Sequence, residues 1–234
     1  MTKIEIINNP ENKADKTQDE KIRAIVEDRN KVIAKRFNLP EKDLKIELHF
    51  SKQKLLSEIR NTGDSLGVYC GYLDWTDKIH LIHPSTVTTI FKDNLNKEIS
   101  IMIDYCLIKF YMCKKYWPEQ KGFKLYYKHV SEQLAKISSG NYRENIIKFD
   151  MKIFVERKRY TPDKEIAIIF YIMLQKSGLD YIYEHLDKII EDCDIKKTTF
   201  NIYKKSLWDL IAPYQKEIKE EERKLQNAFK IRRR

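Results

Sequence analysis

The first third of the chain switches between a helical and a strand-like pattern of hydrophobic positions. Between Asp19 and Phe37 the apolar residues fall on one helical face, which indicates an amphipathic helix. A short helix is expected after Ser51, which is a suitable N-cap. Stretches that alternate or are rich in β-branched and aromatic residues predict strands at Lys45–Phe50, Leu66–Asp74 and Lys78–Ile82. The last two strands lie close enough in sequence to form a hairpin.

After the hairpin the pattern is helical throughout. The most apolar helix is Glu98–Lys115, which ends before Trp117-Pro118. Further helices are expected over Thr86–Leu95, Lys124–Ile137, Asn141–Phe154, Leu179–Cys193 and from Ser206 to the C-terminus. Another is expected to start with Thr161 as N-cap and Pro162 at its first position and to include Ile166–Ser177. Mixed elements followed by helices alone predict an α+β fold. We expect a small N-terminal mixed β-sheet with backing helices, then a helical C-terminal subdomain, with a cleft between the two.

Length and composition predict a single folded domain. The chain has 234 residues, of which 42% are hydrophobic, enough to bury one sizeable core. Residues 1–18 are polar and are expected to form a loose N-terminal tail, in which Lys3–Ile7 has a strand-like pattern. Residues 19–234 are expected to form the domain, with the sheet in residues 19–97 and the helical part in residues 98–234.

The chain is basic, with a net charge of +10, so acidic partners such as nucleic acid enter consideration. Acidic residues are nevertheless interspersed almost everywhere, and this favours a solvated, Lys-rich surface. Two basic clusters are the candidate phosphate contacts of a nucleic-acid-binding protein. They consist of Arg157, Lys158, Arg159, Lys230, Arg232, Arg233 and Arg234.

Cysteine usage and hydropathy predict the compartment. The four cysteines, Cys70, Cys106, Cys113 and Cys193, form no CxxC pair and are expected to be free thiols in a reducing environment. Residues 1–20 contain no apolar secretory segment, and no apolar run is long enough to cross a bilayer. We therefore expect a soluble, cytoplasmic protein without membrane contact.

Five stretches, in their order along the chain, resemble the gluzincin metallopeptidases of the peptidase MA-like type, including the small minigluzincins. The resemblance covers about residues 20–220. Its stretches are KIELHFSKQKLLSEI, TGDSLGVYCGYLDWTDKIHLI, EISIMIDYCLIKFY, YYKHVSEQLAKISSG and the pair IAIIFYIMLQKSGLDYIYEHLDKII and KKSLWDLIAPYQKEI. EISIMIDYCLIKFY lies where the family has its HExxH helix.

The zinc motif itself is absent. In HExxH two histidines on one helix face bind Zn²⁺, and the glutamate activates the metal-bound water. Ile103 and Leu107 stand in the histidine positions and Asp104 in the glutamate position. The resemblance assigns the third ligand of the family to Glu132. It therefore implies a gluzincin-like fold whose metal chemistry has been lost.

Asp104 and Glu132 are the vestigial catalytic candidates, and we expect them to face each other across the cleft. A buried carboxylate such as Asp104 needs a cation or a donor, for which Lys109, Lys128 or a tyrosine are candidates, or else stays protonated. The alternative is a rebuilt zinc site, because His129 and Glu132 are three residues apart on one helix face and Asp104 would complete the set.

These observations predict a catalytically degenerate, zinc-peptidase-like protein that binds a protein or peptide partner along an edge strand. Neither enzymatic activity nor a cofactor is expected, with zinc as the alternative. Other catalytic motifs, namely GxSxG, the phosphate loop and GxGxxG, do not occur. Two other functions stay open: a nucleic-acid or ribonucleoprotein-associated factor, and a hydrolase with a site rebuilt from Asp104, His129 and Glu132.

Overall fold

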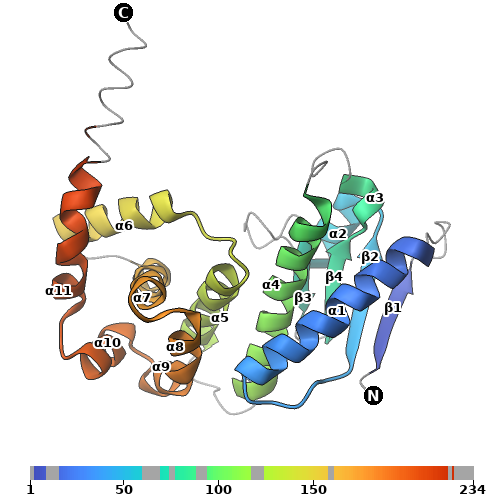
Figure 1. The fold of residues 1–234 in the computed structure, drawn as a ribbon, viewed down its shortest axis with the longest axis horizontal. Helices are drawn as coiled ribbons and strands as arrows, with labels where there is room; N and C mark the ends of the chain where they lie inside the picture. Colours follow the sequence, from blue (N-terminus) through green and yellow to red (C-terminus); the bar gives the residue numbers. More distant parts are fainter. Residues whose placement is uncertain are drawn as a thin grey trace, which may run out of the picture. The chain divides into compact units, whose positions relative to one another are not determined.

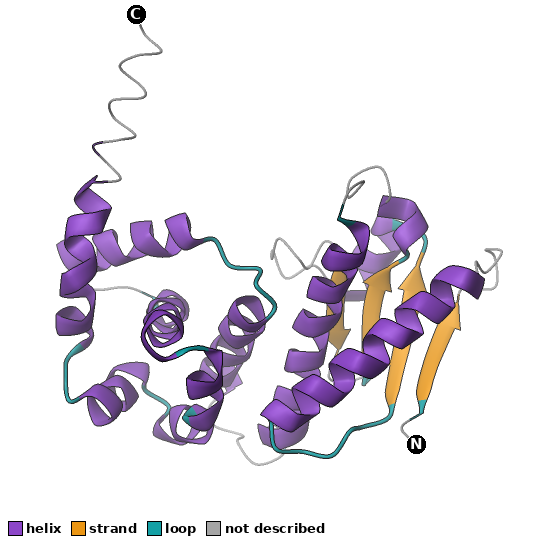
Figure 2. Cartoon of the chain, viewed as in Figure 1, coloured by secondary structure: helices purple, strands orange, loops and turns teal. Residues whose placement is uncertain are grey.

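The computed structural model describes residues 3–8, 16–59, 69–73, 77–87, 94–116, 124–157, 161–220 and 223. The chain forms two compact units, residues 1–122 with 134–141 and residues 123–133 with 142–234. Within the described residues, all strands belong to the first unit and the second is helical (Figure 2). The predicted α+β class is thereby confirmed.

The first unit is built on a four-stranded mixed sheet. Its strands are β1 (Ile4–Asn8), β2 (Leu44–His49), β3 (Cys70–Leu73) and β4 (Lys78–Ile82). Their order is β1-β2-β4-β3. Strands β1, β2 and β4 run parallel to one another, and the edge strand β3 is antiparallel to β4. The predicted hairpin is thus present, but its strand β3 is shorter in the described residues than expected.

Helices cover both faces of this sheet (Figure 1). Helix α1 (Lys16–Arg36) and helix α4 (Leu95–Tyr116) pack against each other on one face. Helix α2 (Lys52–Ile59) covers the other face, and the short helix α3 (Pro84–Val87) follows β4. Successive side chains along a strand point to opposite faces of the sheet. The side chain of Ile46 and those of the residues two positions away therefore face α1 and α4, whereas the side chains adjacent to Ile46 in sequence face α2.

Two features of the first unit bear on the expected chain organisation. The segment predicted as a loose tail contributes β1, because Ile4 is buried and Ile4–Asn8 pairs in register with β2. Helix α4, expected in the helical part, belongs to the unit that contains the sheet. It is buried along most of its length, since its apolar side chains pack on α1, β3 and β4.

The second unit gathers its helices around α7 (Pro162–Ser177), which is buried from Glu165 to Met173 (Figure 1). Its other helices are α6 (Glu144–Arg157), α8 (Leu179–Glu184), α9 (Leu186–Asp192), α10 (Ile195–Tyr203), α11 (Leu207–Ile211) and the 3-10 helix η2 (Ala212–Tyr214). Helix α5 (Lys124–Ser138) contributes residues to both units.

The pattern of the second unit was predicted with two errors. The helix expected over Leu179–Cys193 is interrupted at His185. Helix α10 was not assigned bounds of its own within the helical part, although Asp194 is an N-cap whose carboxylate accepts hydrogen bonds from the amides of Lys196 and Lys197. The sequence signal was therefore the cap, a better guide here than apolar periodicity.

Candidate functional site

Asp104, the acid in the middle of α4, is held by Arg29 of α1. Arg29 donates from Nε to Oδ1 and from Nη2 to Oδ2 of Asp104, each at 2.5 Å. Such a bidentate pair matches the planar guanidinium to both carboxylate oxygens. Asp104 is 7% exposed. Its cation therefore comes from the neighbouring helix and is neither of the two lysines that the sequence suggested.

The electrostatics of this pair reflect its burial. Burial disfavours the ionised carboxylate and raises the pKa of Asp104, although the hydrogen bonds and the charge of Arg29 oppose that shift. The hydrogen bond to Asp104 raises the pKa of Arg29, which stays protonated. Both carboxylate oxygens accept a hydrogen bond from Arg29, so a metal or a proton would compete with the guanidinium for Asp104.

The residues in the two histidine positions supply no metal ligand. Ile103 and Leu107 are buried, and neither side chain has a donor atom. Tyr111, one turn further, donates from its hydroxyl to Oδ1 of Asn30 at 2.6 Å and accepts from the amide of Lys42 at 3.1 Å. In this part of the chain α4 is thus a core helix, joined to α1 by polar contacts.

The alternative zinc site draws on both units. Asp104 belongs to the first unit, whereas His129 and Glu132 belong to the part of α5 in the second. Nδ1 of His129 lies 3.5 Å from Oδ1 of Asp163, which also accepts a 2.6 Å hydrogen bond from Gln133. His129 therefore has an acidic neighbour on α7. Both the rebuilt site and the facing of Asp104 and Glu132 stay predictions.

Strand β3 presents one hydrogen-bonding edge. The amide of Ile82 donates to the carbonyl of Tyr69 at 2.7 Å, so this pair is of the hydrogen-bonded kind. Such pairs alternate along an antiparallel ladder, and therefore Gly71 and Leu73 bond to β4 while the backbone groups of Cys70 and Tyr72 point away from it. Among the described residues, no strand pairs with that outer edge.

The side chains of this edge anchor it on α4. The ring of Tyr72 packs edge-on against Phe110, with centroids 5.5 Å apart. Gly71, on the other face, lies under Ile59 of α2, where an added Cβ would come within 2.9 Å of the Ile59 methyl. Strand β3 is therefore packed against α4 on one face and α2 on the other, and these contacts fix the position of its outward backbone groups.

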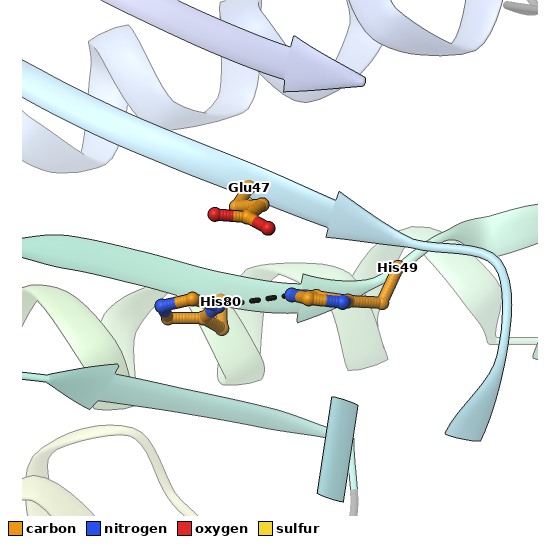
Figure 3. Close-up of side chains that lie close together, drawn as sticks. All are labelled: Glu47, His49 and His80. Carbon is orange, nitrogen blue, oxygen red and sulfur yellow. Dashed lines mark hydrogen bonds between the residues drawn. The ribbon is translucent and has the colours of Figure 1, made fainter. Parts of the chain in front are cut away.

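A second polar group lies on the face of the sheet covered by α2. Glu47 and His49 project from the same face of β2, and His80 is the direct partner of Glu47 on β4 (Figure 3). Nε2 of His49 and Nδ1 of His80 are 2.9 Å apart, in a hydrogen bond. One potential ligand atom from each of the three residues lies within 4.8 Å of the other two.

Burial disfavours the charged form of both rings. It lowers the pKa of His49 and of His80, and the neighbouring His49 lowers the pKa of His80 further, while the charges of Glu47 and Glu58 oppose these shifts. Burial alone would raise the pKa of Glu47, but a 3.0 Å bond from Lys78 and the nearby charges lower it. His80 is 2% exposed, and its Nε2 has no hydrogen-bond partner among the described residues.

The sequence alone did not single out this group. His83 leaves the strand, hydrogen-bonds to Ser85 at 2.6 Å and stacks on Phe50. The available signal was the Glu47-x-His49 spacing, since residues two apart on a strand share a face. Which residue of β4 stands beside them depends on the register between β2 and β4, which the local pattern does not contain.

Most of the predicted nucleic-acid contacts fall outside the described residues. Arg157 ends α6, and its side chain is not among those described; Lys158, Arg159, Lys230 and Arg232–Arg234 lie outside as well.

In the part of the chain that is described, no helix has the length and hydropathy to cross a membrane.

No family model, no curated protein and no solved structure matches this chain.

Proposed function

We propose that this chain is a non-catalytic, gluzincin-like protein that binds an extended segment of a protein partner along β3. The observation that carries the proposal is the outward edge of Cys70 and Tyr72. Their amides and carbonyls point away from β4 and match the repeat of an added strand. The protein would then supply backbone hydrogen bonds to its partner without a reaction.

The arrangement of the first unit supports this reading. The antiparallel edge strand β3 lies beside α4, the long helix after the hairpin, and α1 packs against α4. In a peptidase with this arrangement, the helix would have to present metal ligands. Here Ile103 and Leu107 cannot ligate, and Asp104 is bound to Arg29. Strand addition is the part of peptidase function that needs none of these residues.

The test compares two substitutions at one position. Tyr72→Ala removes the ring but keeps the amide, whereas Tyr72→Pro removes the ring and the outward amide. Because that amide does not bond to β4, the ladder stays intact in both variants. Their difference in affinity therefore reports the backbone contribution alone.

A random peptide library is selected on the full-length protein, and affinity for an enriched peptide is measured by fluorescence anisotropy. We expect Tyr72→Pro to bind about tenfold more weakly than Tyr72→Ala, since a lost backbone bond is worth about 1 kcal/mol or somewhat more. N-methylation of alternate peptide residues should weaken binding in the same way. Equal affinity of the two variants would refute strand addition. Cleavage of the peptide would refute the non-catalytic assignment.

A further inference from the structure

We propose that Glu47, His49 and His80 form a binding site for a divalent transition-metal cation of the Zn²⁺ type. Two imidazoles and one carboxylate are a donor set that Zn²⁺ accepts, with one position left for water. The site is separate from the strand edge of the proposed function. It lies on the face of the sheet covered by α2, whereas Tyr72 faces α4.

The spacing of the donor atoms suits a metal. Two nitrogens bound to tetrahedral Zn²⁺ at about 2.0–2.1 Å are about 3.3 Å apart. Nε2 of His49 and Nδ1 of His80 are 2.9 Å apart, so an ion that replaces the proton between them needs a separation of a few tenths of an ångström more. The Glu47 carboxylate completes a triangle whose sides are within 4.8 Å (Figure 3).

The two ring nitrogens of His80 have different surroundings. Nδ1 lies toward His49, whereas Nε2 is buried and has no hydrogen-bond partner among the described residues. A cation bound at Nδ1 requires the tautomer of His80 whose proton is on Nε2.

The surroundings prepare the ligands for a cation. Metal ions bind the neutral imidazole, and burial already disfavours protonation of both rings. Lys78 holds Oε2 of Glu47 at 3.0 Å, which orients the carboxylate and leaves Oε1 for the ion. A bound cation would join β2 to β4 beneath α2.

The experiment uses the full-length protein after removal of metal with a chelator. Zn²⁺ binding is measured by competition with a chromophoric chelator, and coordination by X-ray absorption of the loaded protein. We expect saturable one-to-one binding, two imidazole ligands and no sulfur ligand. His49→Gln and His80→Gln should each weaken binding by more than about tenfold. Glu47→Gln should also weaken it, and because Glu47 is partly exposed this variant keeps the test valid if a histidine variant misfolds.

Two matched controls accompany these variants. Glu58→Gln removes a carboxylate that acts on both rings through its charge alone. His129→Gln removes a histidine outside the group and belongs to the alternative site with Asp104 and Glu132. Both should bind Zn²⁺ as the unchanged protein does. The proposal is overturned by the absence of saturable binding, by sulfur ligation, by unchanged affinity in His49→Gln and Glu47→Gln, or by loss of binding in His129→Gln.

Discussion

The Arg29–Asp104 pair makes a quantitative prediction about the role of α4. Arg29→Met removes the guanidinium but keeps a side chain of similar length, so Asp104 stays buried without its cation. Removal of one partner from a buried ion pair costs about 3–5 kcal/mol. The Arg29 side chain is 28% exposed, and therefore we expect about 3 kcal/mol, at the low end. For a chain of this length, that corresponds to a fall in Tm of about 6–12 °C.

The double variant Arg29→Met, Asp104→Leu separates a structural pair from a catalytic relic. With both charges gone, no uncompensated charge is left at this site, and stability should return to within about 1 kcal/mol of the unchanged protein. The cycle should then give a coupling energy of a few kcal/mol between the two residues. A double variant that is as unstable as the sum of the single ones would refute the structural pair.

The assay must report on the first unit, because two units need not unfold together. Hydrogen exchange followed by mass spectrometry meets this need, since peptides from α1 and α4 are read separately from those of α7. In Arg29→Met the amides of α1 and α4 should exchange faster, while those of α7 stay unchanged. Equal acceleration in α7 would show that the pair is not a local feature of the first unit.

Two further substitutions test the packing and capping described above. Gly71→Ala should destabilise the first unit by about 1–3 kcal/mol in urea unfolding, because the new Cβ meets the Ile59 methyl at 2.9 Å. The penalty should shrink in an Ile59→Ala background, and an equal penalty there would contradict this cause. Asp194→Ala should cost about 1 kcal/mol through loss of the α10 cap, and Asp194→Ser should restore most of it. Equal stability of these two variants would show that the cap is not what holds α10.

Local elements of the fold were predictable, and their long-range pairing was not. The alternation in Lys45–Phe50 predicted a strand, and β2 spans Leu44–His49. Ile4–Asn8 had only a weak strand-like pattern, and its place beside β2 depends on a parallel pairing across α1. Parallel strands need a crossover connection, so their partners are set by the packing of the whole unit and not by adjacent residues.

The same distinction explains the candidate sites. That Asp104 needs a cation follows from an acid within an apolar helix. The sequence does not show that this cation is Arg29, because Arg29 and Asp104 are 75 positions apart and meet only when α1 packs on α4. Glu47 and His49 are on one face of a strand by their spacing, whereas His80 joins them through the register of β2 and β4.

The two buried polar groups of the first unit differ in how completely they are satisfied, and this difference separates their roles. Asp104 has both oxygens engaged by Arg29, so nothing about it calls for a further ligand. His80 is as deeply buried but leaves a ring nitrogen without a partner among the described residues. Burial of polar groups is costly on either face of the sheet. Asp104 is therefore a compensated core group, whereas the proposed cation site lies with Glu47, His49 and His80 under α2.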